Sequence, residues 1–201
     1  MPTKFNSRFG EIAADLRDQG GELLCPWEGD CWRFQAVSHP RGRDILSGKG
    51  ALQNGGRWNA PGACPVVYGS TSGAVALEES EANGRYYGII SRNARIYVCI
   101  HLNLSRVLDL TNARTQRRLK LVAKHLVAED WRKINADGHE SLTQCVGRAA
   151  HTVGAECVLA PSASVKGGIT LAYFPANRGA ESSVVLHDAV AIAAMLGGRR
   201  E

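Results

Sequence analysis

The residues with the clearest chemical potential form a glycine-rich block, Gly55 to Gly62 (GGRWNAPG). Two glycines before Arg57 allow the backbone at Gly56 to approach a ligand closely. The planar guanidinium of Arg57 can bind a phosphate through paired hydrogen bonds. Trp58 and Asn59 can pack against the turn and fix it. The block therefore marks a candidate anion-binding loop, and the alternative is a surface loop with one buried tryptophan.

An aromatic ring and a carboxylate follow this block at equal intervals. The separation in sequence from Arg57 to Tyr68 is the same as that from Tyr68 to Glu79. A strand that is followed at once by a helix can bring Tyr68 and Glu79 to one pocket. Glu78 points elsewhere on the same helix, so only one of the two glutamates can face the pocket, and the sequence does not decide which. The alternative is a core tyrosine and a solvated helix glutamate.

Two further polar sites stand next to apolar segments. Arg33 lies between Trp32 and Phe34, and strand alternation places it on the opposite face from those rings. A buried arginine needs an anionic partner, which is either structural or a ligand phosphate. Ser162 follows a predicted strand, where hydroxyl groups either contact ligands or form turns. No G-x-S-x-G motif is present, which argues against a serine hydrolase.

Hydrophobic spacing predicts the elements that position these residues. We expect strands over residues 31–37, 65–70, 95–102, 156–160, 168–174 and 182–187. We expect helices over residues 5–16, 72–84, 112–131, 141–153 and 188–196, and an ordered loop over 39–56. Mixed strands and helices without strict alternation favour the α+β class, with a compact mixed sheet and surrounding helices.

Two of the predicted helices carry a predicted inner face. In the helix over 72–84, Ala74, Leu77 and Ala82 are expected to point inward. In the helix over 112–131, the expected inner residues are Leu119, Val122, Leu126 and Val127. The helix over 141–153 is expected to end at Gly154.

Composition limits the class of protein. The chain has 201 residues, of which 44% are hydrophobic and 21% charged, which suits one globular domain. No run of 18 apolar residues occurs, and residues 1–16 carry Lys4, Arg8 and Glu11, so we expect neither a membrane span nor a signal peptide. The expected location is the cytoplasm. The net charge is +5, but basic and aromatic residues do not alternate along one face, so we do not expect nucleic-acid binding.

The six cysteines do not predict a metal site. None forms a C-x-x-C pair, and no histidine lies at zinc-finger spacing from two of them. We therefore expect no metal. Cys99, Cys145 and Cys157 lie in apolar runs and are expected in the core, whereas Cys25 and Cys31 are expected to be free thiols.

Taken together, these segments resemble the RES domain, a family named for its arginine, glutamate and serine. The matching segments begin with Trp32-Arg33-Phe34 and GGRWNAPG, and they continue with VVYGS (66–70), ALEE (76–79), TQCVGRAA (143–150), APSA (160–163) and LAYFP (171–175). The resemblance covers residues 31–175 and beyond. It implies a single domain over residues 1–201, with a helical extension over 1–30 and a core over 31–187.

The resemblance implies a fold similar to that of mono-ADP-ribosyltransferases and an activity on NAD. By position, Arg33 and Arg57 would bind the NAD diphosphate, and Tyr68 would stack on nicotinamide. Glu79 would hold the ribose and stabilise its cationic transition state, and Ser162 would line the pocket. Gly56 and Asn59 would belong to the same binding loop. Tyr68 and Arg57 are therefore counted with Glu79 as catalytic.

The resemblance also implies a biological setting. RES domains are toxins of toxin–antitoxin pairs, and their usual partner is an antitoxin with an Xre-like helix-turn-helix. Water, phosphate or a protein can accept the ADP-ribose group, so NAD hydrolysis, NAD phosphorolysis and protein ADP-ribosylation all remain open. A non-enzymatic binding module is a further alternative, and a homodimer is plausible by family analogy.

Two features depart from the family pattern. Phe34 stands where the family commonly has a tyrosine, so a hydroxyl role there is absent. The N-terminal extension over 1–30 and the segment over 39–52 exceed the smallest members of the family.

Overall fold

A long strand, β3 (Arg95–Asp109), organises the sheet in the computed structural model, which describes residues 4–36, 45–88 and 95–187. Strand β1 (Leu24–Ala36) pairs antiparallel with β3 along nearly its whole length, from Leu24 opposite Leu108 to Ala36 opposite Arg95. Two further strands pair with β3. β4 (Cys157–Pro161) is parallel to it, and β6 (Ser183–Leu186) is antiparallel. The sheet is therefore mixed.

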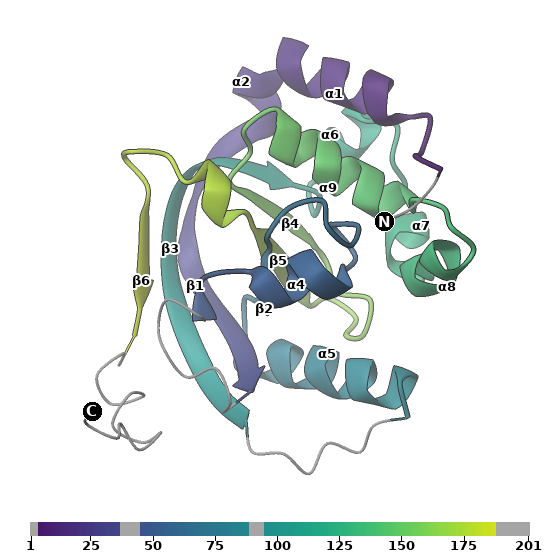
Figure 1. Ribbon diagram of the computed structural model, residues 1–201. Helices are drawn as coiled ribbons and strands as arrows, with labels where there is room; N and C mark the ends of the chain where they lie inside the picture. The colour runs from purple at the N-terminus through teal and green to yellow at the C-terminus, as the bar shows by residue number, and fades with distance from the viewer. Residues whose placement is uncertain (1–3, 37–44, 89–94, 188–201) are drawn as a thin grey trace.

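The sheet curls back onto its first strand. β2 (Val67–Ser70) and β5 (Ile169–Tyr173) pair antiparallel, and β5 pairs in turn with β4. Trp32 of β1 lies opposite Ser70 of β2, so β1 pairs with both β2 and β3. The described strands follow the order β1-β2-β5-β4-β3-β6, and helices cover the curved sheet (Figure 1). The expected mixed-sheet, α+β architecture is confirmed.

Strand alternation separates two buried cores. Val158 and Ala160 of β4 pack against α1 (Phe9–Asp18) and α9 (Leu142–Thr152), in a cluster with Ile12. Cys157 and Leu159 point to the opposite face and join a second cluster inside the curve of β1 and β3. Because both faces of β4 are buried, this strand is nearly all apolar.

The helix α9 forms as its sequence predicts. Ser141 accepts a hydrogen bond from Gln144 N, and the Gln144 side chain returns to Ser141 N, so the two residues form a capping box. Gly154, with φ of +80°, lies just beyond the end of the helix. The α1 helix packs against α9 and is followed by the short α2 (Gly20–Leu23), as Figure 1 shows.

The helix expected over 112–131 is wrong. Three short helices replace it: α6 (Ala113–Arg118), α7 (Ala123–Ala128) and α8 (Trp131–Ala136). Lys120 adopts a left-handed backbone (φ +50°), which interrupts any continuous helix. Leu119 and Leu126 are buried as expected, but Val122 is exposed.

The expected inner face of α5 (Gly73–Tyr86) is wrong for two of its three residues, whereas the third, Ala82, is partly buried and lines a cleft. Val75 and Ala76 are buried, whereas Ala74 and Leu77 are exposed. The apolar residues of this helix are too few and too small to fix its rotation from the sequence. Glu79 lies one turn after Val75 and Ala76, and it therefore shares their inward side.

Other boundaries differ by several residues. β1 begins at Leu24, so the expected division after residue 30 falls inside a strand. The loop expected over 39–56 contains α4 (Lys49–Asn54), and its residues 39–44 lie outside the described part of the chain. The helix expected over 188–196 also lies outside it. A short 3-10 helix, η1 (Pro175–Asn177), follows β5.

The cysteines are all free thiols, and Cys145 and Cys157 are fully buried, whereas Cys99 is only partly buried. Among the described residues, no helix has both the length and the apolar character to cross a membrane.

Candidate active site

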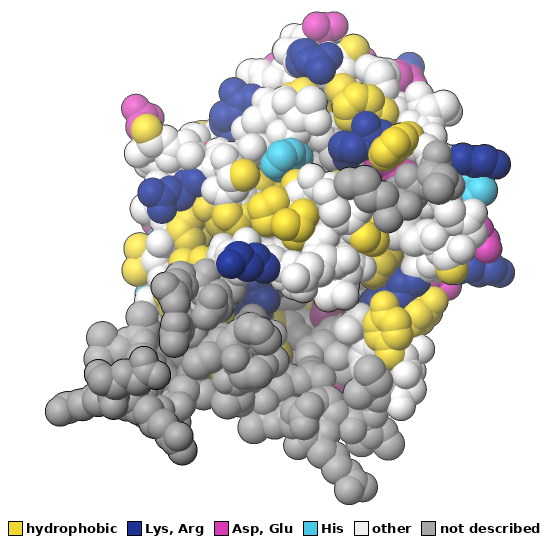
Figure 2. All heavy atoms as spheres, viewed as in Figure 1, with side chains coloured by type: hydrophobic (Ala, Val, Ile, Leu, Met, Phe, Trp, Pro, Cys, Tyr) yellow, Lys and Arg dark blue, Asp and Glu magenta, His cyan; other side chains and the backbone are white. Residues whose placement is uncertain are grey.

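A cleft of about 1120 Å³ lies between α4 and α5, above the ends of β1 and β2. In Figure 2, Lys and Arg side chains lie near the centre of the face, in the region where Figure 1 places α4. The expected site residues that line the cleft are Arg33, Gly56, Arg57, Tyr68 and Glu79. Asn59 and Ser162 lie directly behind its wall.

Glu79, and not Glu78, faces the cleft. The carboxylate oxygen Oε1 of Glu79 accepts a hydrogen bond from Ser162 Oγ at 2.5 Å and lies 3.4 Å from Ser164 N. Glu78 instead forms an ion pair with Arg85 on the outer side of α5. The structure thus selects between two neighbouring carboxylates that the sequence leaves equivalent.

The Ser162 hydroxyl is fixed by its own loop. Its oxygen accepts hydrogen bonds from Ser164 N at 3.1 Å and Val165 N at 2.9 Å. Ser162 is 8% exposed, and its hydroxyl is directed at Glu79. In this geometry Ser162 positions the carboxylate from behind.

The ring of Tyr68 forms part of the cleft wall, and its hydroxyl is anchored in the glycine-rich block. Tyr68 OH donates to Asn59 Oδ1 at 2.8 Å and accepts from Trp58 N at 2.8 Å. Burial raises the pKa of Tyr68 well above its ordinary value, so the phenol stays neutral. A Cβ at Gly56 would lie 2.5 Å from the Tyr68 ring, so glycine is required there.

Asn59 is almost fully buried, and its side-chain polar atoms bond to the protein. Its amide nitrogen donates to Ala51 O at 2.8 Å and to Cys64 O at 3.2 Å, and its oxygen accepts from Tyr68. These bonds join α4, the glycine-rich block and β2. Asn59 therefore holds the loop and Tyr68 together, and it does not reach the cleft surface.

Arg57 is held by the carboxyl-terminal end of α7. Its Nη1 donates to Leu126 O at 2.7 Å and to Glu129 O at 3.1 Å. Burial lowers the pKa of Arg57, and the nearby carboxylates of Glu79 and Glu129 oppose this shift. In the described part of the chain, Nη1 donates both of these hydrogen bonds. The N–H groups of Nε and Nη2 are therefore left for an anion in the cleft.

Arg33 reaches the cleft from β1. Its Nη1 donates to Ile45 O at 3.1 Å, and burial lowers its pKa, although an arginine remains charged at neutral pH. Trp32 and Phe34, which also line the cleft, lie on the other face of the strand, where both rings contact Tyr97. The alternation expected for this strand is therefore confirmed.

Comparisons with known proteins identify the family of this chain. The family model of the RES domain matches residues 30–193. This chain belongs to the RES domain family. Proteins named NAD(+) phosphorylase MbcT, from Mycobacterium tuberculosis and Mycobacterium bovis, are 30% identical to it over 157 residues, which cover 76% of this chain and 77% of theirs.

One solved structure resembles this RES domain in fold. The crystal structure of the M. tuberculosis MbcT–MbcA toxin–antitoxin complex contains a chain that superposes with a TM-score of 0.64 at 22% sequence identity. The match covers 92% of the present chain and 96% of that chain. The two chains therefore share their fold over almost their whole length.

Gln144 supports this RES domain's site, although no motif in the sequence predicts a role for it. Gln144 is fully buried on α9, and its Nε2 donates to Gly56 O at 3.0 Å and lies 3.3 Å from Asn59 O. On the same helix, a Cβ at Gly147 would collide with the carbonyl oxygen of Trp58. Local sequence spacing does not reveal this contact, because it joins Gln144 to a loop 88 residues away.

The part of the cleft between α5 and α8 is also not predicted by the sequence. Arg132 of α8 lies over the rings of Tyr86 and Trp131, with its carbon Cζ 4.5 Å and 4.4 Å from their centroids. Its Nη2 bonds to Asn83 Oδ1 at 2.5 Å, and all four residues line the cleft. This part of the cleft joins α5 to α8, an association that local sequence spacing does not reveal.

Proposed function

We propose that this RES domain cleaves NAD at the bond between nicotinamide and ribose and transfers the ADP-ribose group to phosphate. The observation that carries the proposal is the position of Glu79, whose carboxylate is fixed on the wall of a cleft that Arg33 and Arg57 also line. The relatives named NAD(+) phosphorylase support phosphate as the acceptor. The cleft volume of about 1120 Å³ is ample for a dinucleotide.

The residues divide into groups that contact substrate and groups that position them. Arg33 and Arg57 bind the diphosphate, because each brings a buried cation to the cleft. Tyr68 stacks on nicotinamide with its ring, since its hydroxyl is already bonded to Trp58 and Asn59. Ser162 and Asn59 act behind the surface by positioning Glu79 and Tyr68.

The chemistry follows from the charge of Glu79. As the bond from ribose carbon to nicotinamide nitrogen breaks, its electron pair leaves with nicotinamide and positive charge develops on the ribose. A fixed carboxylate beside that charge stabilises the transition state by about 3 kcal/mol. A phosphate oxygen then bonds to the ribose carbon, which gives a phosphorylated ADP-ribose and free nicotinamide.

Several finer features belong to the same proposal. The curved mixed sheet with a cleft at its edge is compatible with an ADP-ribosyltransferase-like fold. The toxin–antitoxin complex that contains the structural relative supports a toxin role with an antitoxin partner. We assign that partner an Xre-like helix-turn-helix, and we place the enzyme in the cytoplasm as a single RES-type domain that can pair as a homodimer. The reaction needs no metal.

Incubation of the purified chain with NAD, with and without phosphate, tests the proposal. We expect nicotinamide release that depends on phosphate, with a phosphorylated ADP-ribose as the second product. Free ADP-ribose at equal rates in both samples would identify a hydrolase. Labelled ADP-ribose attached to protein would identify a transferase. If no nicotinamide is released under any of these conditions, the chain is a non-enzymatic binding module.

A further inference from the structure

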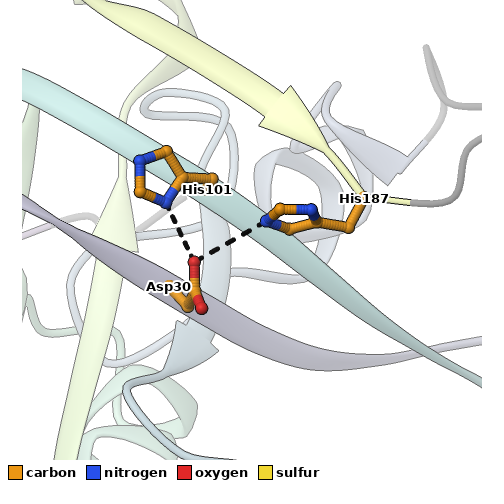
Figure 3. A group of neighbouring side chains, drawn as sticks. All are labelled: Asp30, His101 and His187. Carbon is orange, nitrogen blue, oxygen red and sulfur yellow. Dashed lines mark hydrogen bonds and ion pairs between the residues drawn. The ribbon is translucent and has the colours of Figure 1, made fainter.

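Two histidines and an aspartate converge on the solvent-facing side of the sheet, away from the cleft. Asp30 lies on β1, His101 on β3, and His187 directly after β6 (Figure 3). Asp30 and His101 are direct cross-strand partners. His187 N donates to Cys99 O at 3.0 Å, which continues the ladder between β6 and β3. Strand register therefore fixes all three side chains on one face.

The ligand atoms have the spacing of a metal site. Asp30 Oδ1 lies 2.9 Å from His101 Nδ1 and 3.8 Å from His187 Nε2. One oxygen is thus shared between two imidazoles, and the three atoms all lie within 4.8 Å of one another. Ligands of a tetrahedral zinc ion with bonds of about 2.1 Å lie about 3.4 Å apart. The ion therefore fits between these atoms after shifts on the order of 1 Å or less.

A second carboxylate orients one of the imidazoles. Glu28 Oε1 lies 3.2 Å from His101 Nε2, and Glu28 Oε2 accepts from Asn103 at 3.2 Å. If His101 Nε2 donates to Glu28, its Nδ1 is left as a lone-pair donor on the side of Asp30 and His187. Carboxylate–histidine–metal sites use this arrangement to fix the ring and its tautomer.

We propose that Asp30, His101 and His187 bind a zinc ion, with Glu28 holding His101 in place and water completing the coordination. Two imidazoles with one carboxylate suit zinc, whereas calcium and magnesium prefer oxygen ligands alone. The side chains of His101 and His187 are 34% and 50% exposed, so an ion can enter from solvent. Because its ligands come from three segments of the sheet, the ion links β6 to β3 and β1. None of the three residues lines the cleft, so the ion takes no part in NAD chemistry.

Zinc titration of the full chain, purified without a histidine tag and freed of metal, tests this site. Calorimetry should show one zinc ion bound per chain. His101→Ala and His187→Ala should each weaken binding at least 100-fold, and Glu28→Gln about 10-fold. His125→Ala, at an exposed position on α7, is the matched control and should bind zinc like the unaltered chain.

A second measurement separates binding from misfolding. Zinc should raise the melting temperature of the unaltered chain and of His125→Ala, but not that of His187→Ala or Asp30→Asn. Melting temperatures without zinc show whether each variant folds. Absence of saturable zinc binding overturns the proposal, as does equal affinity in the unaltered chain, His101→Ala and His187→Ala. Nicotinamide release is independent of this result, because the site and the cleft share no residue.

Discussion

Ser162 donates its only hydroxyl proton to Glu79, a residue 83 positions earlier in the chain. A serine hydroxyl has one donor and two acceptor sites. Both acceptor sites are filled by the N–H groups of Ser164 and Val165. The proton of Ser162 must therefore point at the carboxylate, which fixes one oxygen of Glu79 on the cleft wall.

Glu79→Gln should lower the rate of nicotinamide release by at least 100-fold and leave NAD affinity almost unchanged. The amide keeps the size of the side chain and can still accept from Ser162, but it removes the charge that stabilises the ribose cation, worth about 3 kcal/mol. Steady-state rates and calorimetric titration with NAD measure the two effects. Glu78→Gln is the matched control, because Glu78 pairs with Arg85 outside the cleft. Similar rates in the two variants would remove Glu79 from the mechanism.

Ser162→Ala should reduce the turnover rate by about 10-fold, with a smaller change in NAD affinity. The variant loses one hydrogen bond to Glu79, which is worth about 1.5 kcal/mol when the acceptor is charged. Ser164→Ala is the control, because Ser164 contacts Glu79 through its backbone N–H alone in the described contacts. Equal turnover of Ser162→Ala and the unaltered chain would contradict the positioning role.

Arg57→Lys should weaken NAD binding by about 10-fold to 100-fold, which corresponds to about 1.5 to 3 kcal/mol. The ammonium group keeps the charge but cannot bond Leu126 O and Glu129 O while presenting a planar fork to a diphosphate. Arg33→Ala should weaken binding by a similar amount. Calorimetry measures both, and unchanged affinity in both variants would refute the diphosphate assignment.

Tyr68→Phe should destabilise the fold by about 1 to 3 kcal/mol, because it removes a buried hydroxyl that satisfies both Trp58 N and Asn59 Oδ1. Denaturant unfolding measures this loss. The exposed Tyr87 provides the control variant Tyr87→Phe, which should be nearly neutral. A Tyr68→Phe chain as stable as the unaltered one would show that the hydroxyl network does not hold the loop.

Glu156→Gln should destabilise the fold by about 2 kcal/mol at neutral pH, the usual order for hydrogen bonds to a buried charged group. The buried carboxylate accepts from Gly179 N at 2.7 Å, Ser105 N at 2.8 Å and Arg106 N at 2.9 Å. Burial alone raises the pKa of Glu156, but hydrogen bonds from Ser182, Gly179 and Ser105 outweigh it and lower the pKa below 4.5. The ionised group therefore binds its partners better than the protonated group does.

The sign of this shift sets the pH window. A carboxylate with a lowered folded-state pKa stabilises the fold above its unfolded-state pKa, and that stability is lost as pH falls through the folded-state value. The stability difference between the unaltered chain and Glu156→Gln should be constant above about pH 5.5 and shrink below pH 4.5. Unfolding curves at several pH values measure it. A difference that persists at the lowest pH would assign the effect to packing, and Glu81→Gln, at an exposed position, controls for surface charge.

Local sequence patterns predict a helix or strand well where a short run of neighbouring residues determines it. The α9 helix follows from the hydrophobic spacing over 141–153 and a stop at Gly154, and β4 and β5 follow from short apolar runs. The break at Lys120 could not be predicted, because nothing in its side chain requires a left-handed backbone. The α4 helix was hidden by the glycines that flank it, Gly48 and Gly55.

The sequence predicts which residues belong to the candidate site, but it does not predict how they are arranged in space. The order of strand and helix predicts one pocket for Tyr68 and Glu79, and the resemblance to the RES domain adds Arg57 to them. The sequence could not show that Asn59 is buried behind Tyr68, since that depends on contacts with Ala51 and Cys64. The Asp30, His101 and His187 cluster has no local motif at all, because only the pairing of three strands brings it together.

The packing of α1 on α9 has a consequence for the smallest unit that can work. The face of α9 that carries Gln144 and Gly147 holds the glycine-rich block, and another face is covered by Ile12 and Leu16 of α1. A chain shortened to begin at β1 would retain every residue of the cleft and yet expose the apolar side of the helix that shapes it. The N-terminal helix α1 thus supports α9 from behind. The shortest active chain must therefore contain more than the residues that line the cleft.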